Sequence, residues 1–190
     1  MKRPLLLTNC LLAAATLLGP AAMPARSQDA PAPKAIRDGQ HDFDFNFGTW
    51  TTHITRRVHP LSGSDERAQM TGTVTVRKVW GGSAWLEEIV ADGGGAHLEG
   101  MTLFVYTPAS RQWSQSYIDK SGARDAALIG AFSGGRGELY AQDMLDGRAI
   151  LIRATWSEIA PDSHRFEEAY SDDGGTTWET EFSANLTRKS

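Results

Sequence analysis

Glutamates with apolar neighbours are the residues whose types and spacing could do chemistry in this sequence. They occur in pairs at positions 87–88, 167–168 and 179/181, inside segments that alternate like β-strands. Neighbouring side chains of a strand face opposite sides, so only one member of each adjacent pair can point inward. A carboxylate that points inward among apolar neighbours needs a partner, or its pKa is raised.

The alternation selects particular inward residues. Glu168 keeps phase with Phe166 and Tyr170. Arg56 keeps phase with Trp50 and is a candidate partner for an inward carboxylate. Such an inward Glu/Arg set could bind the polar end of a ligand inside the fold. The competing interpretation is a structural ion pair or a solvated outer face, because surface pairs are common and contribute little.

One strand has two alternative phases. Glu88 keeps phase with Leu86 and Val90, whereas the opposite phase places Trp85, Glu87 and Ile89 inside. Trp156, in a strand interior, is a candidate wall of a cavity. The predicted ligand-binding set is Arg56, Glu88, Trp156, Glu168 and Tyr170.

Motifs for metal, phosphate or nucleophilic chemistry are missing from the sequence. Its five histidines show no H-x-H or H-E-x-x-H spacing. No G-x-S-x-G stands between a strand and a helix, and the glycine-rich stretches look like hairpin turns. We therefore predict no metal and no cofactor, and we assign no catalytic residue.

Short β-branched or aromatic segments separated by turn signals fill the chain from Thr49 onward. Long apolar periods of 3.6 residues do not occur, so we expect few helices. Ten candidate strands span 49–58, 73–80, 84–92, 97–107, 111–119, 124–132, 137–143, 148–159, 164–171 and 177–187. Sequential strands with short turns predict an all-β, antiparallel up-and-down barrel, because closure removes exposed edges. A two-sheet sandwich is the alternative.

The stretch "SDDGGTTW" fits the pattern S-x-D-x-G-x-T-W, with Ser171, Asp173, Gly175, Thr177 and Trp178 in place. It resembles the Asp-box of sialidases and other propeller glycosidases. Those proteins repeat the box, whereas here it occurs once and lies between two strand segments. Glycines supply the backbone angles of a tight turn, and a short Asp or Ser side chain accepts backbone N–H bonds. We therefore predict a hairpin staple, with structural roles for Asp173, Gly175 and Trp178.

A G-x-W motif, Gly48-Thr49-Trp50, starts the first strand. It resembles the motif of lipocalin-like, or calycin, barrels. The resemblance implies that Trp50 plugs the closed base of a barrel and that an arginine of the last strand, here Arg188, lies across it. Cation–π attraction of about 0.5–2 kcal/mol would join the two.

A wider resemblance covers nearly all of the chain from about His41 to its end. The stretches "FDFNFGTW", "YTPASRQW" and "GAFSGGRGELY" are similar to a bacterial family classed as a domain of unknown function. That family supports the barrel and transfers no catalytic residue. A more distant relation is nitrobindin, a haem-binding barrel, but no histidine here matches the context of its ligand histidine. Haem is therefore disfavoured.

The first residues predict export. Lys2 and Arg3 precede an apolar run, Leu5 to Gly19, and a small-residue cleavage site lies before Gln28. The run is shorter than the ~20 apolar residues that cross a bilayer, so residues 1–27 predict a signal peptide and a periplasmic or secreted protein. Cys10, the only cysteine, is removed with it, which excludes cysteine-based chemistry. A lipoprotein anchor at Cys10 is disfavoured, because "LTNC" has no small residue before the cysteine.

The rest of the chain divides into a Pro/Ala-rich disordered linker at 28–40 and one barrel domain at 41–190. The formal net charge of −4 becomes more negative once the signal is removed, which argues against nucleic acid. The oligomeric state is open.

Three functions fit these observations. The first is a non-enzymatic binder of one small apolar or amphipathic molecule inside the barrel. The second is an enzyme of the lyase or isomerase type that uses an inward carboxylate. The third is a structural module with a filled core, and fold analogy does not choose among them.

Overall fold

The computed structural model describes residues 37–190, so the predicted signal peptide and most of the predicted linker lie outside the described residues. Ten strands follow one another, together with two short 3₁₀ helices, η1 (Asp44–Asn46) and η2 (Trp80–Gly82). The strands are β1 (Gly48–Arg57), β2 (Arg67–Val79), β3 (Ala84–Gly93), β4 (Ala96–Thr107), β5 (Gln112–Asp119), β6 (Leu128–Ser133), β7 (Arg136–Leu145), β8 (Arg148–Ala160), β9 (Ser163–Ser171) and β10 (Glu179–Arg188). No helix in this part of the chain is long and apolar enough to span a bilayer.

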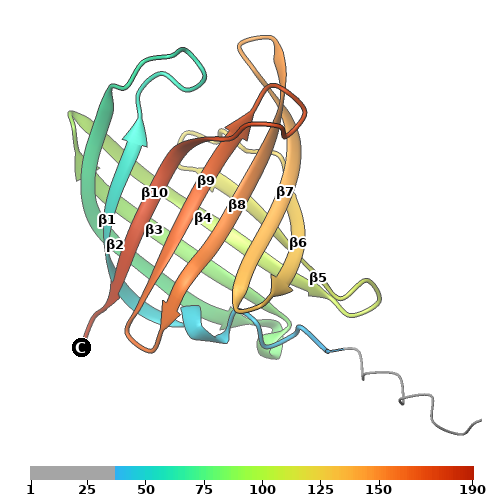
Figure 1. Ribbon diagram of the computed structural model, residues 1–190. Helices are drawn as coiled ribbons and strands as arrows, with labels where there is room; N and C mark the ends of the chain where they lie inside the picture. The colour runs from blue at the N-terminus through green and yellow to red at the C-terminus, as the bar shows by residue number, and fades with distance from the viewer. Residues whose placement is uncertain (1–36) are drawn as a thin grey trace, which may run out of the picture. The chain divides into compact units, whose positions relative to one another are not determined.

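The strands form one closed antiparallel barrel (Figure 1). Each strand pairs with its neighbour in sequence, and β1 also pairs with β10, so that Trp50 lies opposite both Val74 and Arg188. Closure leaves no edge strand in the sheet, which is the physical reason that an up-and-down chain of this kind rolls up. The predicted all-β barrel of about ten strands is confirmed, and the sandwich alternative is wrong.

The seam between β5 and β6 is the shortest pairing in the barrel. Only three residue pairs join them, from Trp113↔Gly130 to Gln115↔Leu128. Beyond Gln115, β5 continues along β4 to Asp119, and the chain then crosses over residues 120–127 and returns at Leu128. The predicted strand at 124–132 therefore begins four residues later than expected, and a loop borders the interior there.

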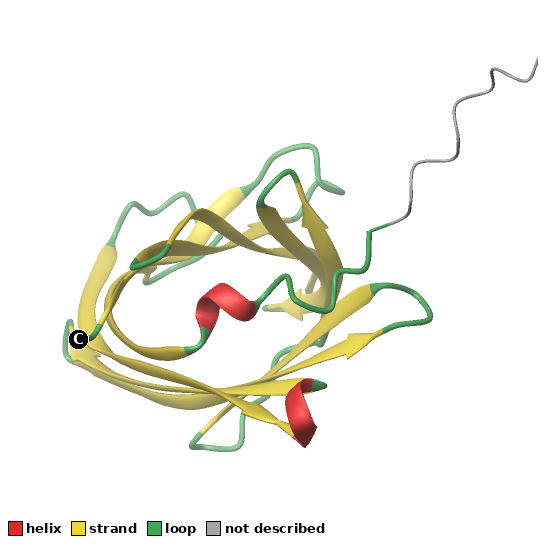
Figure 2. Ribbon diagram, turned by 90° about the horizontal axis from the view of Figure 1, so that it is seen from below, coloured by secondary structure: helices red, strands yellow, loops and turns green. Residues whose placement is uncertain are grey.

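An aromatic plug closes one end of the barrel. Figure 2 shows η1 lying inside the ring of strands, seen from below. Phe43, which precedes this helix, is 1% exposed. Its ring centroid lies 4.8–5.1 Å from those of four aromatic residues on four different strands, namely Phe104, Trp113, Phe132 and Trp156. Three of these contacts are edge-to-face and the one with Phe104 is tilted, so aromatic side chains fill the base of the barrel.

The ordered domain reaches into the predicted linker. Trp113 Nε1 donates to the carbonyl oxygen of Gly39 at 2.9 Å. Tyr106 donates to an Asp38 carboxylate oxygen at 2.8 Å and accepts from the Gly39 N–H at 3.1 Å. These bonds fix residues 38–39 to the base of the barrel, so the barrel domain begins before His41.

Candidate ligand-binding site

A cavity of about 130 Å³ lies inside the barrel, above the plug. Its apolar wall includes Val74, Leu128, Trp156, Phe166 and Leu186, which come from five strands. This volume is close to that of a cavity of about 150 Å³ that holds one benzene ring. The space therefore suits a ligand with a core the size of one ring.

A cluster of charged and hydroxyl groups lines the cavity on the side away from the plug. Arg56, Asp125, Glu168 and Glu181 border the space. Tyr170 does not border it, but its hydroxyl donates to Glu181 Oε1 at 3.4 Å. Arg56 Nε lies 3.6 Å from Glu181 Oε2, with the Arg56 side chain 54% exposed and that of Glu181 only 5% exposed. The arginine therefore reaches solvent while the carboxylate stays inside.

The three carboxyl groups of this cluster have raised pKa values. Burial, together with the charges of Glu181 and Asp125, raises the pKa of Glu168 to about 8. Burial also raises the pKa of Glu181, against the attraction of Arg56. Asp125 shows a raised pKa as well, from burial and then from the charge of Asp143. Desolvation and like charge disfavour ionisation here, and one arginine does not offset them.

A β-bulge places Glu181 inside the barrel. The register between β10 and β9 shifts between Thr180 and Phe182, so that Glu181 and Phe182 both border the cavity. Bulges re-aim a side chain in this way and are common beside functional sites. Strict alternation with the inward Ala184 and Leu186 would have sent Glu181 to the outside, so alternation reasoning missed it.

A second polar group lies deeper in the barrel. Asn46 of η1 donates from Nδ2 to Glu87 Oε2 at 3.2 Å. Burial raises the pKa of Glu87 to about 6, although hydrogen bonds from Asn46 and Thr102 oppose the rise. Gln115, 6% exposed, also borders the cavity, and its Oε1 has no hydrogen-bond partner among residues 37–190.

His164 borders the cavity next to the plug. Its ring packs edge-on against Trp50 at 4.6 Å and against Phe45 at 5.1 Å. Burial and the nearby charge of Arg188 lower the pKa of His164 to about 4. The imidazole is therefore neutral at pH 7, and within the described part of the chain its Nδ1 has no hydrogen-bond partner.

The prediction that Glu88 points inward is wrong. Its side chain is 58% exposed on the outer surface, with Arg77 Nε at 3.9 Å. Trp85 sets the phase of β3, because it is 2% exposed and stacks on Trp113 at 4.2 Å. The alternative phase therefore holds, with Glu87 and Ile89 at the cavity. Trp85 itself belongs to the base of the barrel rather than to the cavity wall.

The other members of the predicted set are brought together. Arg56, Trp156 and Glu168 border the cavity, and Tyr170 lies behind Glu181. Four residues that line the cavity are absent from the predicted set: Glu87, which was in the alternative phase of its strand, and Asp125, His164 and Glu181. Asp125 comes from the 120–127 crossing, where alternation carries no information.

The predicted closure of the base is confirmed. Trp50 is fully buried, and the Arg188 guanidinium lies 4.1 Å from its ring centroid. Gly48 has φ of +113°, and a Cβ there would lie 2.7 Å from Arg188 Nη1. Only glycine fits both the backbone angle and the space that the guanidinium occupies. Gly48, Trp50 and Arg188 therefore each have a packing reason.

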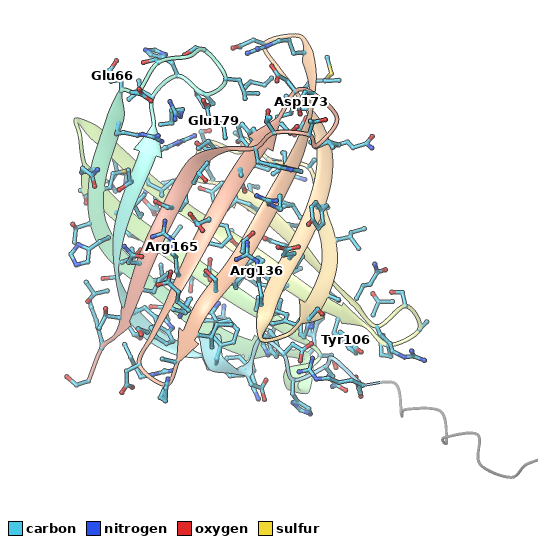
Figure 3. All side chains as sticks on the ribbon, in the orientation of Figure 1. Glu66, Tyr106, Arg136, Arg165, Asp173 and Glu179 are labelled. Atoms are coloured by element: carbon cyan, nitrogen blue, oxygen red, sulfur yellow. The ribbon has the colours of Figure 1, made fainter. Side chains whose placement is uncertain are left out.

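The "SDDGGTTW" stretch forms the hairpin between β9 and β10 (Figure 3 labels Asp173). Asp173 accepts from the Thr177 N–H at 2.9 Å and from the Thr177 hydroxyl at 2.6 Å. Ser171 accepts from the Gly175 N–H at 2.8 Å, and Trp178 Nε1 donates to the Gly175 carbonyl at 3.0 Å. Gly175 has φ of +89°. The side-chain hydrogen bonds of Ser171, Asp173 and Trp178 are made within the turn, as predicted for a staple.

The site defines a class: a closed antiparallel barrel with a plugged base and a small acidic cavity. Over residues 37–190 no group of three or more His, Cys, Asp or Glu side chains could hold a metal ion.

A likeness to one solved structure supports the barrel fold. No family model matches the chain, and no curated protein sequence matches it. Among solved structures it is similar to the S-type phycobiliprotein lyase CPES from Guillardia theta, with a TM-score of 0.56 and 11% identity over 81% of this chain and 94% of that chain. A de novo designed fluorescence-activating β-barrel aligns with a TM-score of 0.43 and 14% identity over 81% of this chain and 100% of that chain. At such identities the likeness concerns the lipocalin-like barrel alone.

Proposed function

We propose that the barrel binds one small amphipathic or apolar molecule in its interior cavity. The observation that carries this function is the mixed lining of the cavity: aromatic and aliphatic walls with a few convergent polar groups. Pockets that bind small molecules have this composition. Because the plug fills the base, the ligand enters from the opposite end, where Arg56 and Asp125 reach solvent.

Ligand titrations test this function. A panel of one-ring amphiphiles of neutral, cationic and anionic type is titrated while tryptophan emission and the melting temperature are followed. Trp156 borders the cavity, so a bound ligand changes its emission, and binding raises the melting temperature with ligand concentration.

Ala184→Leu, which adds volume inside the cavity, is expected to abolish the response. Ala131→Leu, on the exposed face of β6, is the matched control. If no ligand of the panel changes the tryptophan emission or the melting temperature of the wild type, the binding function is rejected in favour of a structural module.

An enzyme of the lyase or isomerase type is the second candidate, favoured by one observation. Glu168 borders the cavity and has a pKa of about 8, which suits proton transfer near neutral pH. Ligands from the panel are incubated with the protein in heavy water and examined by mass spectrometry. Deuterium incorporated at carbon by the wild type and not by Glu168→Gln would establish proton abstraction. If the ligand contains no deuterium, the enzymatic function is rejected and the binding function is retained.

We further propose membership of the bacterial barrel family that the chain resembles, and export to the periplasm or medium. The wide resemblance from His41 supports the first, and the pattern of residues 1–27 supports the second. Sequencing of the mature N-terminus should begin near Gln28. A mature chain that starts at Met1 would reject export.

A further inference from the structure

We propose that the cavity selects a small organic cation: a protonated amine that carries one apolar group the size of a ring. This inference rests on the proposed binding function and names its ligand class. It follows from the charges that face the cavity. Four carboxyl groups border the space, and Arg56 is the one guanidinium or ammonium group among the described lining residues. His164 adds no positive charge at pH 7, because its pKa is about 4.

Glu181 is the lining residue with the clearest capacity to accept a further hydrogen bond. It is 4% exposed, and its Oε1 accepts from Tyr170. Its Oε2 has no hydrogen-bond partner in the part of the chain that is described. Arg56 Nε is 3.6 Å away and half-exposed, so it attracts Oε2 without forming a hydrogen bond. A buried carboxylate left in this state is costly unless another donor reaches it.

Two of the unpartnered atoms around the cavity have the character that an ammonium group requires. An ammonium has three N–H donors and no acceptor. Glu181 Oε2 and Gln115 Oε1 are both acceptors that point to no donor within residues 37–190 and that belong to cavity-lining residues. Tyr117 and Tyr170 have raised pKa values, because burial disfavours their phenolate forms, and they stay neutral hydroxyls.

The walls also favour a cation over an anion. Trp156, Phe166 and Phe182 border the same space, and aromatic faces attract cations. An anionic ligand such as a fatty acid would instead bring a further negative charge into a cavity where burial already raises the pKa values of Glu87, Glu168 and Glu181, so its ionised form would be disfavoured in the same way.

Three isosteric probes test the ligand class: benzylamine, benzyl alcohol and benzoate, titrated by calorimetry into the full barrel domain at pH 7. Benzylamine is expected to bind about ten- to hundred-fold more tightly than benzyl alcohol, since hydrogen bonds to a charged group are the stronger ones. Benzoate is expected not to bind. Glu181→Gln should weaken benzylamine by about tenfold or more and weaken benzyl alcohol much less, while Glu88→Gln on the outer surface changes neither.

Proton release gives a second readout that a structural role of Glu181 would not produce. Glu168 is largely protonated at pH 7, and a bound cation favours its ionised form. The heat of benzylamine binding should therefore vary with the ionisation enthalpy of the buffer.

The outcomes separate this inference from the proposed function. If benzyl alcohol binds as tightly as benzylamine, or if benzoate binds best, the amine class is rejected and ligand binding stands. If none of the three probes binds, the amine class is rejected, and the broader panel decides whether the cavity binds anything.

Discussion

The guanidinium carbon of Arg188 lies 4.1 Å from the centroid of the Trp50 ring and covers it from outside the barrel base. The same guanidinium donates to the carbonyl oxygens of Phe45 and Phe47, at 3.1 and 2.6 Å. Arg188 thus binds the last strand to the segment that carries the plug. Trp50 Nε1 donates to the Asn46 carbonyl at 2.9 Å, which holds η1 from the inner side.

Trp50→Ala is expected to lower the free energy of unfolding by about 3–5 kcal/mol, because it removes a fully buried indole. Arg188→Ala should lower it less. The double variant should show a coupling of about 0.5–2 kcal/mol in urea unfolding, the range of a cation–π contact. Arg165→Ala, on the outer face (Figure 3), is the control for loss of a surface arginine. Additive effects of the two substitutions would show that the contact between Trp50 and Arg188 contributes nothing to stability.

Asp173→Ala is expected to lower the melting temperature without weakening ligand binding. The carboxylate accepts hydrogen bonds from Thr177 and Ser171, which hold its pKa at about 2. Because the pKa is lowered on folding, this contribution is present above about pH 3.8 and is lost as the pH falls toward 2. Thermal scans at pH 7 and in acid measure both effects, with Asp172→Ala as the neighbouring control. An unchanged melting temperature with loss of a sugar-directed activity would reverse the interpretation of this stretch.

Local pattern was sufficient to predict the number and order of the strands and the closure of the base. Thr52 and Ile54, which share the phase of Trp50 and Arg56, are both buried. The G-x-W motif and the terminal Arg188 met as expected, because residues at the two ends of an up-and-down barrel become neighbours when β1 pairs with β10. These features depend on period and chain order, which a sequence contains.

The parts that failed depend on contacts between distant segments. The sequence of β3 allows either set of alternate side chains to face the interior. The stacking of Trp85 on Trp113 determines which set does. Glu181 was missed because a bulge reverses its face, and no neighbouring residue type marks that bulge. Phe43 was missed as a plug, although the "FDFNF" run before the G-x-W holds three phenylalanines with no strand pattern to explain them. The alternating strand pattern does not predict a short helix, such as η1, that lies inside the barrel.

The contribution of Glu168 to the stability of the protein is expected to fall as the pH rises from about 4.5 to 8. The pKa of Glu168 rises from 4.5 to about 8 on folding, so over this range the folded state holds a proton that the unfolded state has released. Where the folded state binds more protons, stability falls with pH. Glu87, with a pKa of about 6, adds to the lower part of the same slope.

Glu168→Gln should flatten the upper part of this dependence and raise the melting temperature at pH 8. Melting temperatures recorded at intervals from pH 5 to 8 measure the slope, and Glu88→Gln serves as the control on the outer surface. A slope that is the same in the wild type and Glu168→Gln would mean that solvent reaches the carboxyl and keeps it ionised.

His164 is expected to stay neutral until the pH falls well below 6.5. Burial is the main cause and the charge of Arg188 the second, and together they lower its pKa to about 4. The unfolded chain therefore binds a proton before the folded chain does. The contribution of His164 to stability is full above about pH 6.5 and is lost as the pH falls toward 4, opposite in sign to that of Glu168.

Proton NMR of the imidazole resonances separates the effect of His164 from that of the carboxyls, because it follows one ring at a time. His97 provides an internal contrast, since hydrogen bonds to Asp92 and Glu99 raise its pKa. The His164 resonance, assigned from its loss in His164→Gln, should not shift between about pH 8 and 5.5, whereas that of His97 should. If His164 titrates near 6.5, water reaches its ring from the cavity, and burial does not lower its pKa.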